Sequence, residues 1–227
     1  MSVHRETSGA LRVLPRGRHA APREVVADSQ RERMLVAMAE ACATKGYANV
    51  AVADVIERAH VSRRSFYEQF SNKEDCFLAA YDAGVAGLLE EIAAAEEAAR
   101  PSGGLLAAAR AGTETYLQLL ADNPAFARTF LIEVLGAGPD ALARRDAVHQ
   151  RFAERLMEGF EAVRGGAGAG GAVPAPAPFV FRAAVGAIHE LVTQELLVGG
   201  PEALPGLLDQ VLEVELRLLG GGVGGVG

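Results

Sequence analysis

The sequence has little of what strands, secretory signals or membrane spans require. Alternation of Val, Ile and Thr is nearly absent, while alanine, leucine and glycine dominate the 227 residues, which favours helices over strands. No run of about eighteen strongly apolar residues occurs. The longest uncharged run, residues 165–181, is rich in Gly, Ala and Pro and would not span a bilayer. The N-terminus has arginines but no apolar block behind them, so no secretory signal is expected.

The chain has only two cysteines, Cys42 and Cys76. Two thiols are too few for a disulfide framework, and they indicate a reducing, cytoplasmic setting. Cys42 shares one helical stripe with Leu35 and Met38, so core packing is expected rather than redox sensing.

Motifs typical of enzymes and metal sites are missing. The sequence contains no G-x-S-x-G, no paired-cysteine motif and no H-x-x-x-H, and Asp146 and His149 have no second pair to complete a metal site. Gly166, Gly168 and Gly171 match G-x-G-x-x-G, but no strand precedes them. No catalytic residue, metal or cofactor is therefore expected.

Charge is distributed unevenly along the chain, whose formal net charge is −7. Residues 1–28 carry +2, residues 29–76 are neutral, and residues 77–227 carry −9. An acidic body repels DNA, so any contact with nucleic acid is expected from the N-terminal third.

Caps, breakers and helical periodicity predict an all-α fold of about nine helices. Asp28 or Ser29 is expected to cap the first, which ends at Lys45. The next six are expected over residues 52–60, 62–69, 73–98, 102–121, 124–135 and 139–164, and the last two from Pro178 and Pro201, each closed by a glycine pair. The predicted domains are a disordered basic arm (1–28), a helix-turn-helix DNA-binding domain (29–76), a ligand-binding and dimerisation domain (77–220) and a disordered tail (221–227).

The segment HVSRRSFYEQFSNKEDCF, residues 60–77, carries the strongest functional signal. Two short helices joined by a tight turn are typical of a helix-turn-helix, whose second helix enters the major groove with its N-terminal residues nearest the bases. Arg63, Arg64 and Ser65 hold that place, and arginine matches guanine in a bidentate way. A solvated basic patch on a small helical subdomain would show the same periodicity.

Among the neighbouring residues, some are expected to anchor the second helix in the core and others to contact DNA phosphates. Phe66 and Phe70 are four apart and are expected to face inward, which leaves Tyr67 free to aim its hydroxyl at a phosphate. Lys73 opens the following helix, where a cation and backbone N–H groups together suit a phosphate oxygen.

The stretch GYANVAVADVIERAHVSRRSFYEQFSNKEDCFLAAYD closely resembles the DNA-binding region of the tetracycline-repressor (TetR) family, from about Arg31 to Asp82. The resemblance implies a homodimeric, all-helical regulator that binds double-stranded operator DNA and a small-molecule effector. By position, it implies that seven residues contact DNA: Tyr47, Ser62, Arg63, Arg64, Ser65, Tyr67 and Lys73. For Tyr47 either a backbone contact or simple packing is possible.

The sequence departs from the family pattern at three positions. Ala51 replaces the usual Ser or Thr before the second helix, and Ala53 replaces a common arginine. His60 replaces the turn glycine, so it must take a positive φ or alter the turn. Two phosphate contacts are thereby expected to be lost.

The acidic body also resembles one branch of the family, over ADNPAFARTFLIEVLGAGPDALARRDAVHQRF. The last helix is apolar over much of its circumference, which a symmetric partner would explain. Bulky or polar side chains are the candidates for ligand contact: Tyr116, Phe130, Phe152 and His189, with Glu133 and His149 as further polar candidates. A lone histidine on an apolar stripe is also typical of a satisfied core residue. Composition favours a largely apolar effector with one or two polar anchors.

Together these features predict a cytoplasmic repressor that a small apolar effector releases from a palindromic operator. An activator, a ligand-independent regulator, or an enzyme or transport module with a helix-turn-helix scaffold are the alternatives.

The arginine-rich arm is expected to compensate for the missing phosphate contacts. Deleting residues 1–28 should lower operator affinity and flatten the dependence of log affinity on log salt, because fewer counterions are released. Gel shifts over a salt series measure both quantities, and an unchanged slope would contradict this role.

Overall fold

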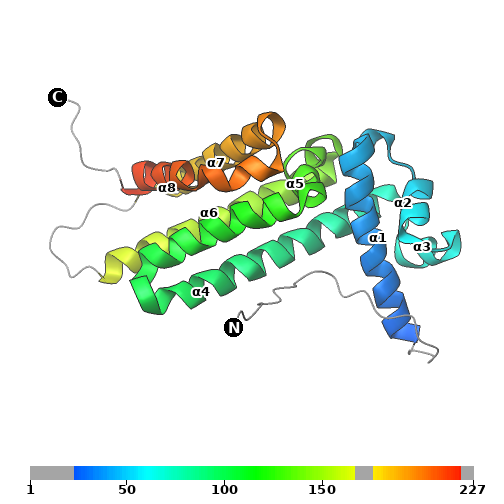
Figure 1. Cartoon of the computed structure of the whole chain (residues 1–227), viewed down its shortest axis with the longest axis horizontal. Helices are drawn as coiled ribbons and strands as arrows, with labels where there is room; N and C mark the ends of the chain where they lie inside the picture. The colour runs from blue at the N-terminus through cyan, green and yellow to red at the C-terminus, as the bar shows by residue number, and fades with distance from the viewer. Residues whose placement is uncertain (1–22, 167–175, 221–227) are drawn as a thin grey trace, which may run out of the picture.

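The computed structural model describes residues 23–166 and 176–220, and every regular element in those residues is a helix (Figure 1). The predicted all-α fold is confirmed. The predictions for most of the basic arm, most of the Gly-Ala-Pro linker and the C-terminal tail concern residues 1–22, 167–175 and 221–227, which lie outside the described residues.

The described residues form eight α-helices, and short 3-10 segments stand between some of them. The α-helices are α1 (Arg23–Lys45), α2 (Val52–Ala59), α3 (Arg63–Gln69), α4 (Lys73–Asp122), α5 (Pro124–Leu131), α6 (Pro139–Gly166), α7 (Pro178–Val198) and α8 (Leu208–Glu215). The 3-10 segments are η1 (Tyr47–Asn49), η2 (Glu133–Gly136) and η3 (Pro201–Leu207), and a π-helical turn, η4 (Leu216–Gly220), follows α8.

Helices α1, α2 and α3 gather at one end of the molecule around the start of α4 (Figure 1). The tight turn between α2 and α3 places His60 in the left-handed region at φ 51°, which is the first of the two outcomes left open by the missing glycine. The N–H of Val61 then closes on the Ile56 carbonyl at 3.2 Å. The strained His60 therefore keeps the turn that a glycine would normally make.

Helix α1 begins at Arg23, so the prediction that it starts at Asp28 or Ser29 is wrong. No proline or glycine lies between Arg23 and Lys45, and Asp28 is exposed, so its polar side chain is tolerated inside a helix. A deletion that tests the arm should therefore end at residue 22, which leaves α1 whole.

The long helix α4 folds back on itself. Gly103 and Gly104 have non-helical backbone angles, and Gly104 has φ 65°. A side chain on Gly112 would meet the Glu96 carboxylate, so the two arms lie side by side and antiparallel. A break between two helical arms was therefore predicted correctly, but its position was not. The chain turns at Gly103 and Gly104, and Pro101 lies inside the first arm. With α4 counted as two arms, the described residues contain nine α-helical segments.

Two other predicted helices are shorter than expected. The helix that opens at Pro124 ends at Leu131 rather than Leu135, and the chain continues as η2. The last α-helix begins at Leu208, because Pro205 lacks the N–H that an α-helix needs and η3 accommodates it instead.

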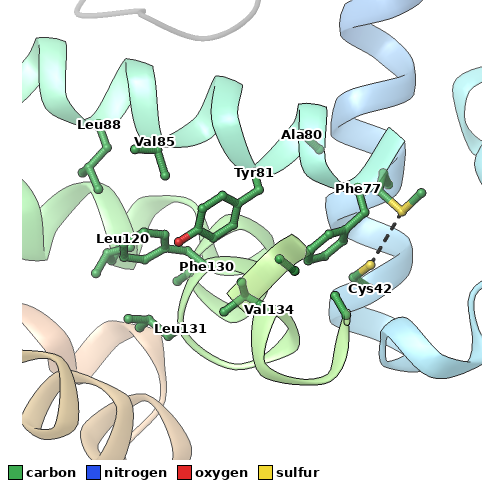
Figure 2. Close-up of a cluster of buried hydrophobic side chains, with 14 of the residues drawn as sticks. Cys42, Phe77, Ala80, Tyr81, Val85, Leu88, Leu120, Phe130, Leu131 and Val134 are labelled. Atoms are coloured by element: carbon green, nitrogen blue, oxygen red, sulfur yellow. Dashed lines mark hydrogen bonds between the residues drawn. The ribbon is translucent and has the colours of Figure 1, made fainter. Parts of the chain in front are cut away.

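One hydrophobic core runs from the helix-turn-helix into the body. Phe77 and Tyr81 on α4 are buried at the junction, and Figure 2 shows them in one cluster with Cys42 of α1 and Leu131 of α5. The Cys42 thiol donates to the Met38 sulfur at 3.7 Å (Figure 2). Burial raises the pKa of both thiols, Cys42 and Cys76, to about 12, which suits the predicted packing role rather than thiolate chemistry.

Helix α4 approaches α5 at Gly84, and this close approach predicts a contrast between two glycines. A Cβ on Gly84 would overlap the Phe126 ring, whereas a Cβ on Gly87 would meet nothing within 4 Å. Gly84→Ala should lower the free energy of unfolding by about 1–3 kcal/mol through overpacking. Gly87→Ala should raise it by up to about 1 kcal/mol through helix propensity. Urea unfolding measures both, and equal effects would show that the Phe126 contact is not restrictive.

Candidate DNA-binding surface and effector domain

Helix α3 is held in place by its cap and by two buried rings. The Ser62 hydroxyl accepts from the Ser65 N–H at 3.0 Å, as a helix N-cap does. Phe66 and Phe70 are almost fully buried, with ring centroids 5.6 Å apart. Arg31 of α1 lies over the Phe70 ring at 4.6 Å. The inward anchoring expected of these phenylalanines is therefore present.

The outer face of α3 presents two arginines and a tyrosine. Arg63 and Arg64 are exposed, and Tyr67 is 48% exposed. Arg64 pairs with Glu68 at 2.8 Å, and this carboxylate raises the pKa of the guanidinium. Arg63 lies 5.8 Å from the Tyr67 ring centroid and forms no ion pair with an acid of the described residues. Arg63 is thus the more available of the two, because Arg64 must leave Glu68 to contact a base.

Lys73 and Tyr47 form one unit behind α3. The Lys73 ammonium donates to the Tyr47 carbonyl at 3.0 Å and lies 4.2 Å from the centroid of its ring. The Tyr47 ring also meets Phe77 edge-on at 4.7 Å. Burial is the main cause that raises the pKa of the Tyr47 hydroxyl. The packing role left open for Tyr47 is present, and Lys73 is half-buried with part of its donor capacity already used.

The start of α2 is capped without the usual hydroxyl. The Asp54 carboxylate accepts from the Ala51 N–H at 2.8 Å and pairs with Lys45 at 2.6 Å. The hydrogen bond from Lys45 is the first cause that lowers the pKa of Asp54, followed by the Ala51 N–H. Asp54 therefore supplies its own arm of a capping box, and its N–H donates to the Ala51 carbonyl at 3.0 Å in place of the missing hydroxyl.

Glu133 joins the body to the helix-turn-helix, a role that the sequence did not predict. Its carboxylate accepts from the Tyr47 N–H at 2.7 Å and from Arg128 at 3.1 Å, and its side chain is only 11% exposed. The amide that it receives opens η1, so a carboxylate from η2 caps the segment between α1 and α2. Glu133 and Tyr47 are 86 positions apart, and no local pattern could have paired them.

The four side chains proposed for effector contact form two aromatic pairs inside the body. Tyr116 lies 6.0 Å from Phe152, and Phe130 lies 6.4 Å from His189, between ring centroids. The His189 ring is also 4.8 Å from that of His149. Burial, followed by nearby positive charge or the other imidazole, lowers the pKa of both histidines to about 4, so both are neutral near pH 7.

Two cavities are present elsewhere in the described residues. The larger, about 630 Å³, lies where α1, α2, α5 and the end of α7 meet, and Arg58 and Arg128 are among its lining residues. The other, about 310 Å³, lies between α6 and α7 beside the exposed Phe179. Neither is lined by the four proposed effector contacts, whose role stays a prediction.

None of the described helices combines the length and hydropathy that crossing a bilayer requires. In residues 23–166 and 176–220, no group of three or more His, Cys, Asp or Glu side chains is placed to hold a metal ion.

Comparison with known proteins agrees with the fold and the helix-turn-helix. A family model described as bacterial regulatory proteins, tetR family, matches residues 35–80. No curated protein matches the sequence.

Several solved structures share the fold over most of its length. The fatty acid degradation regulator FadR from Bacillus halodurans is 19% identical, with a TM-score of 0.68 over 85% of this chain and 95% of its own. FadR from Bacillus subtilis, solved with stearoyl-CoA, is 16% identical, with a TM-score of 0.67 over 85% and 99%. A putative TetR-family transcriptional regulator from Syntrophomonas wolfei is 17% identical, with a TM-score of 0.65 over 84% and 95%. The chain is therefore similar to the tetR family of bacterial regulatory proteins over residues 35–80, and it shares its fold with these solved structures over most of its length.

Proposed function

We propose that the chain is a ligand-responsive DNA-binding transcriptional regulator, a repressor that a small apolar effector releases from a palindromic operator. The carrying observation is the outer face of α3, where Arg63, Arg64 and Tyr67 are exposed on a helix that two buried rings hold from behind. Rigid support with exposed arginines at the N-terminal end suits readout of base edges in a major groove.

In this proposal, residues 29–76 bind DNA and residues 77–220 bind the effector and dimerise. The DNA contacts are the seven proposed side chains: Tyr47, Ser62, Arg63, Arg64, Ser65, Tyr67 and Lys73. Tyr67 and Lys73 contact phosphates, and the two side chains lie in different environments. Tyr67 is exposed beside Phe66, whereas Lys73 is held on Tyr47 and offers only its remaining donors.

A homodimer would cover apolar surface at the end of the body. Val211 and Leu207 face the core, but Leu216 is 61% exposed and Leu218 is 41% exposed on the turn that follows α8. A second copy that pairs through this end would remove those leucines from water and place two α3 helices for two half-sites. The protein would act in the cytoplasm, where its operator is found.

The effector is proposed to act through the contact between Glu133 and Tyr47. Phe130 lies three residues before Glu133 and belongs to both the proposed effector cluster and the core. A ligand that prefers one arrangement of α5 and η2 would shift the population of helix-turn-helix orientations. The stearoyl-CoA complex of the Bacillus subtilis FadR supports a long apolar effector for this chain as well.

The proposed DNA contacts predict two distinct mutant behaviours. Arg63→Ala should change base preference and cost about 1–3 kcal/mol on the preferred operator. Lys73→Ala should weaken all sequences alike and reduce the salt slope by about one. Arg100→Ala, at the far end of the first arm of α4, is the matched control.

Gel shifts with the DNA upstream of the gene, repeated over single-base variants, measure these effects, and melting temperatures check the fold. A wild-type chain that protects none of the adjacent intergenic DNA would contradict the proposed function. If both variants merely unfold, the assigned contacts are wrong.

The link between the body and the helix-turn-helix predicts a further effect. Glu133→Ala removes the acceptor of the half-buried Tyr47 N–H and should lower the free energy of unfolding by about 1–3 kcal/mol. It should also change operator affinity at temperatures where the protein remains folded. Glu90→Ala, an exposed position on α4, should change neither. Operator affinity equal to that of the wild type would mean that Glu133 does not position the DNA-binding end.

A further inference from the structure

Four buried polar atoms in the body have no hydrogen-bond partner. They are Tyr81 Oη, Arg145 Nε, His149 Nε2 and Thr193 Oγ1, and no other buried side-chain nitrogen or oxygen of the described residues is left in this state. We call these four side chains the polar cluster. Buried polar groups are normally bonded, so each such group calls for a partner.

The polar cluster draws on three helices that meet in the body. Arg145 and His149 are one turn apart on α6, so they share a face. Thr193 is one turn beyond His189 on α7, and His189 lies 4.8 Å from the His149 ring. Tyr81 of α4 stacks on Phe130 at 5.7 Å, and Phe130 is 6.4 Å from His189. Figure 2 shows the Tyr81 hydroxyl directed inward beside Leu120 and Phe130.

Electrostatics connect the same groups. Positive charge on Arg145 acts to lower the pKa of Tyr81, His149 and His189, so the guanidinium lies near all three. Burial dominates in each case, raising the pKa of Tyr81 and lowering the pKa of both histidines. Near pH 7 the phenol is therefore protonated, the imidazoles are neutral, and Arg145 carries the only charge of the polar cluster.

That charge has no counter-ion in the described residues. Arg144, its neighbour in sequence, pairs with Asp82, but no ion pair joins Arg145 to an acid. A guanidinium offers only donors, a phenol and a threonine hydroxyl can each donate, and a neutral imidazole can donate from Nε2 in one tautomer. The complement of this set is an acceptor with a negative charge, which a water molecule or an alcohol does not supply.

The surroundings of the polar cluster are apolar. Tyr116 and Phe152 meet edge to face nearby, and Leu117, Phe130 and Val148 are buried in the same core. We propose that the polar cluster binds the carboxylate head of the effector, whose apolar body lies among these aromatic and aliphatic side chains. This rests on the proposed function in one respect, that the body is where the effector binds.

The test compares head groups at constant chain length on the full-length protein. Straight-chain carboxylates from octanoate to stearate are measured by calorimetry and by the rise in melting temperature, each beside the alcohol and the CoA thioester of the same chain. The carboxylates are expected to bind at least about tenfold more tightly than the alcohols, since a charge-assisted bond replaces a neutral one. A CoA thioester that binds where the free carboxylate does not would overturn the proposal.

Arg145→Gln and Arg144→Gln form a matched pair on one helix. Arg145→Gln is expected to weaken carboxylate binding about ten- to hundredfold and leave alcohol binding unchanged, while Arg144→Gln leaves both unchanged. Tyr81→Phe is expected to weaken the carboxylate by about fivefold, because it deletes one hydroxyl and keeps the ring. Neither Arg145→Gln nor Tyr81→Phe should lower the melting temperature of the ligand-free protein, because each removes an atom that has no partner there.

Each remaining result would overturn the assignment. Equal affinity for carboxylates and alcohols would mean that the polar cluster does not distinguish a charged head group from a neutral one. Equal losses in the two arginine variants would point to general surface charge, and a lower melting temperature of ligand-free Arg145→Gln would make Arg145 a structural residue. Absence of any binding to the wild type would leave the cluster filled by water alone.

Operator binding separates this proposal from the proposed function. Gel shifts without ligand are expected to be the same for the wild type and Arg145→Gln, because the polar cluster lies in the body. If the protein binds operator DNA but no carboxylate, the proposed carboxylate site is wrong and the proposed regulatory function is kept. If carboxylates bind through Arg145 but no DNA is recognised, the carboxylate site is kept and the regulatory function is wrong.

Discussion

Everything in this structure depends on the burial of one face of α4 against both ends of the molecule. Phe77 meets the Tyr47 ring of the helix-turn-helix, and one turn later Tyr81 stacks on Phe130 of the body. Both side chains are almost fully buried in a single continuous core (Figure 2). Since close-packed interiors transmit displacement rather than absorb it, neither end can rotate about α4 without disturbing the other.

A polar contact adds direction to this apolar link. Tyr47 is held by three contacts. Phe77 packs against its ring, Lys73 donates to its carbonyl, and Glu133 accepts from its N–H. Apolar packing imposes no hydrogen-bond direction, whereas a carboxylate that accepts from a single amide N–H fixes both a distance and a direction. The segment between α1 and α2 is therefore fixed from α4 and from η2 at once, and α2 and α3 follow it.

The parts of the fold that the sequence predicted are those decided within a few residues. The cap at Ser62 and the inward Phe66 and Phe70 follow from local chemistry, and the family resemblance agreed with them. At His60, where the family has glycine, local chemistry left two outcomes open, and the chain takes the positive φ. The early end of α5 did not follow, because Glu133 leaves helical register to reach an amide 86 positions away.

The same division holds for the candidate sites. Arg63, Arg64 and Tyr67 could be named from spacing on one short helix. The polar cluster could not, because its members come from α4, α6 and α7, and only the fold leaves their atoms buried and unpaired. Tyr81 belongs to both systems, since its ring is part of the shared core and its hydroxyl is part of the cluster. An anion bound at that hydroxyl would act on the ring stacked against Phe130, three residues before Glu133, so effector and DNA would be coupled through one short run of contacts.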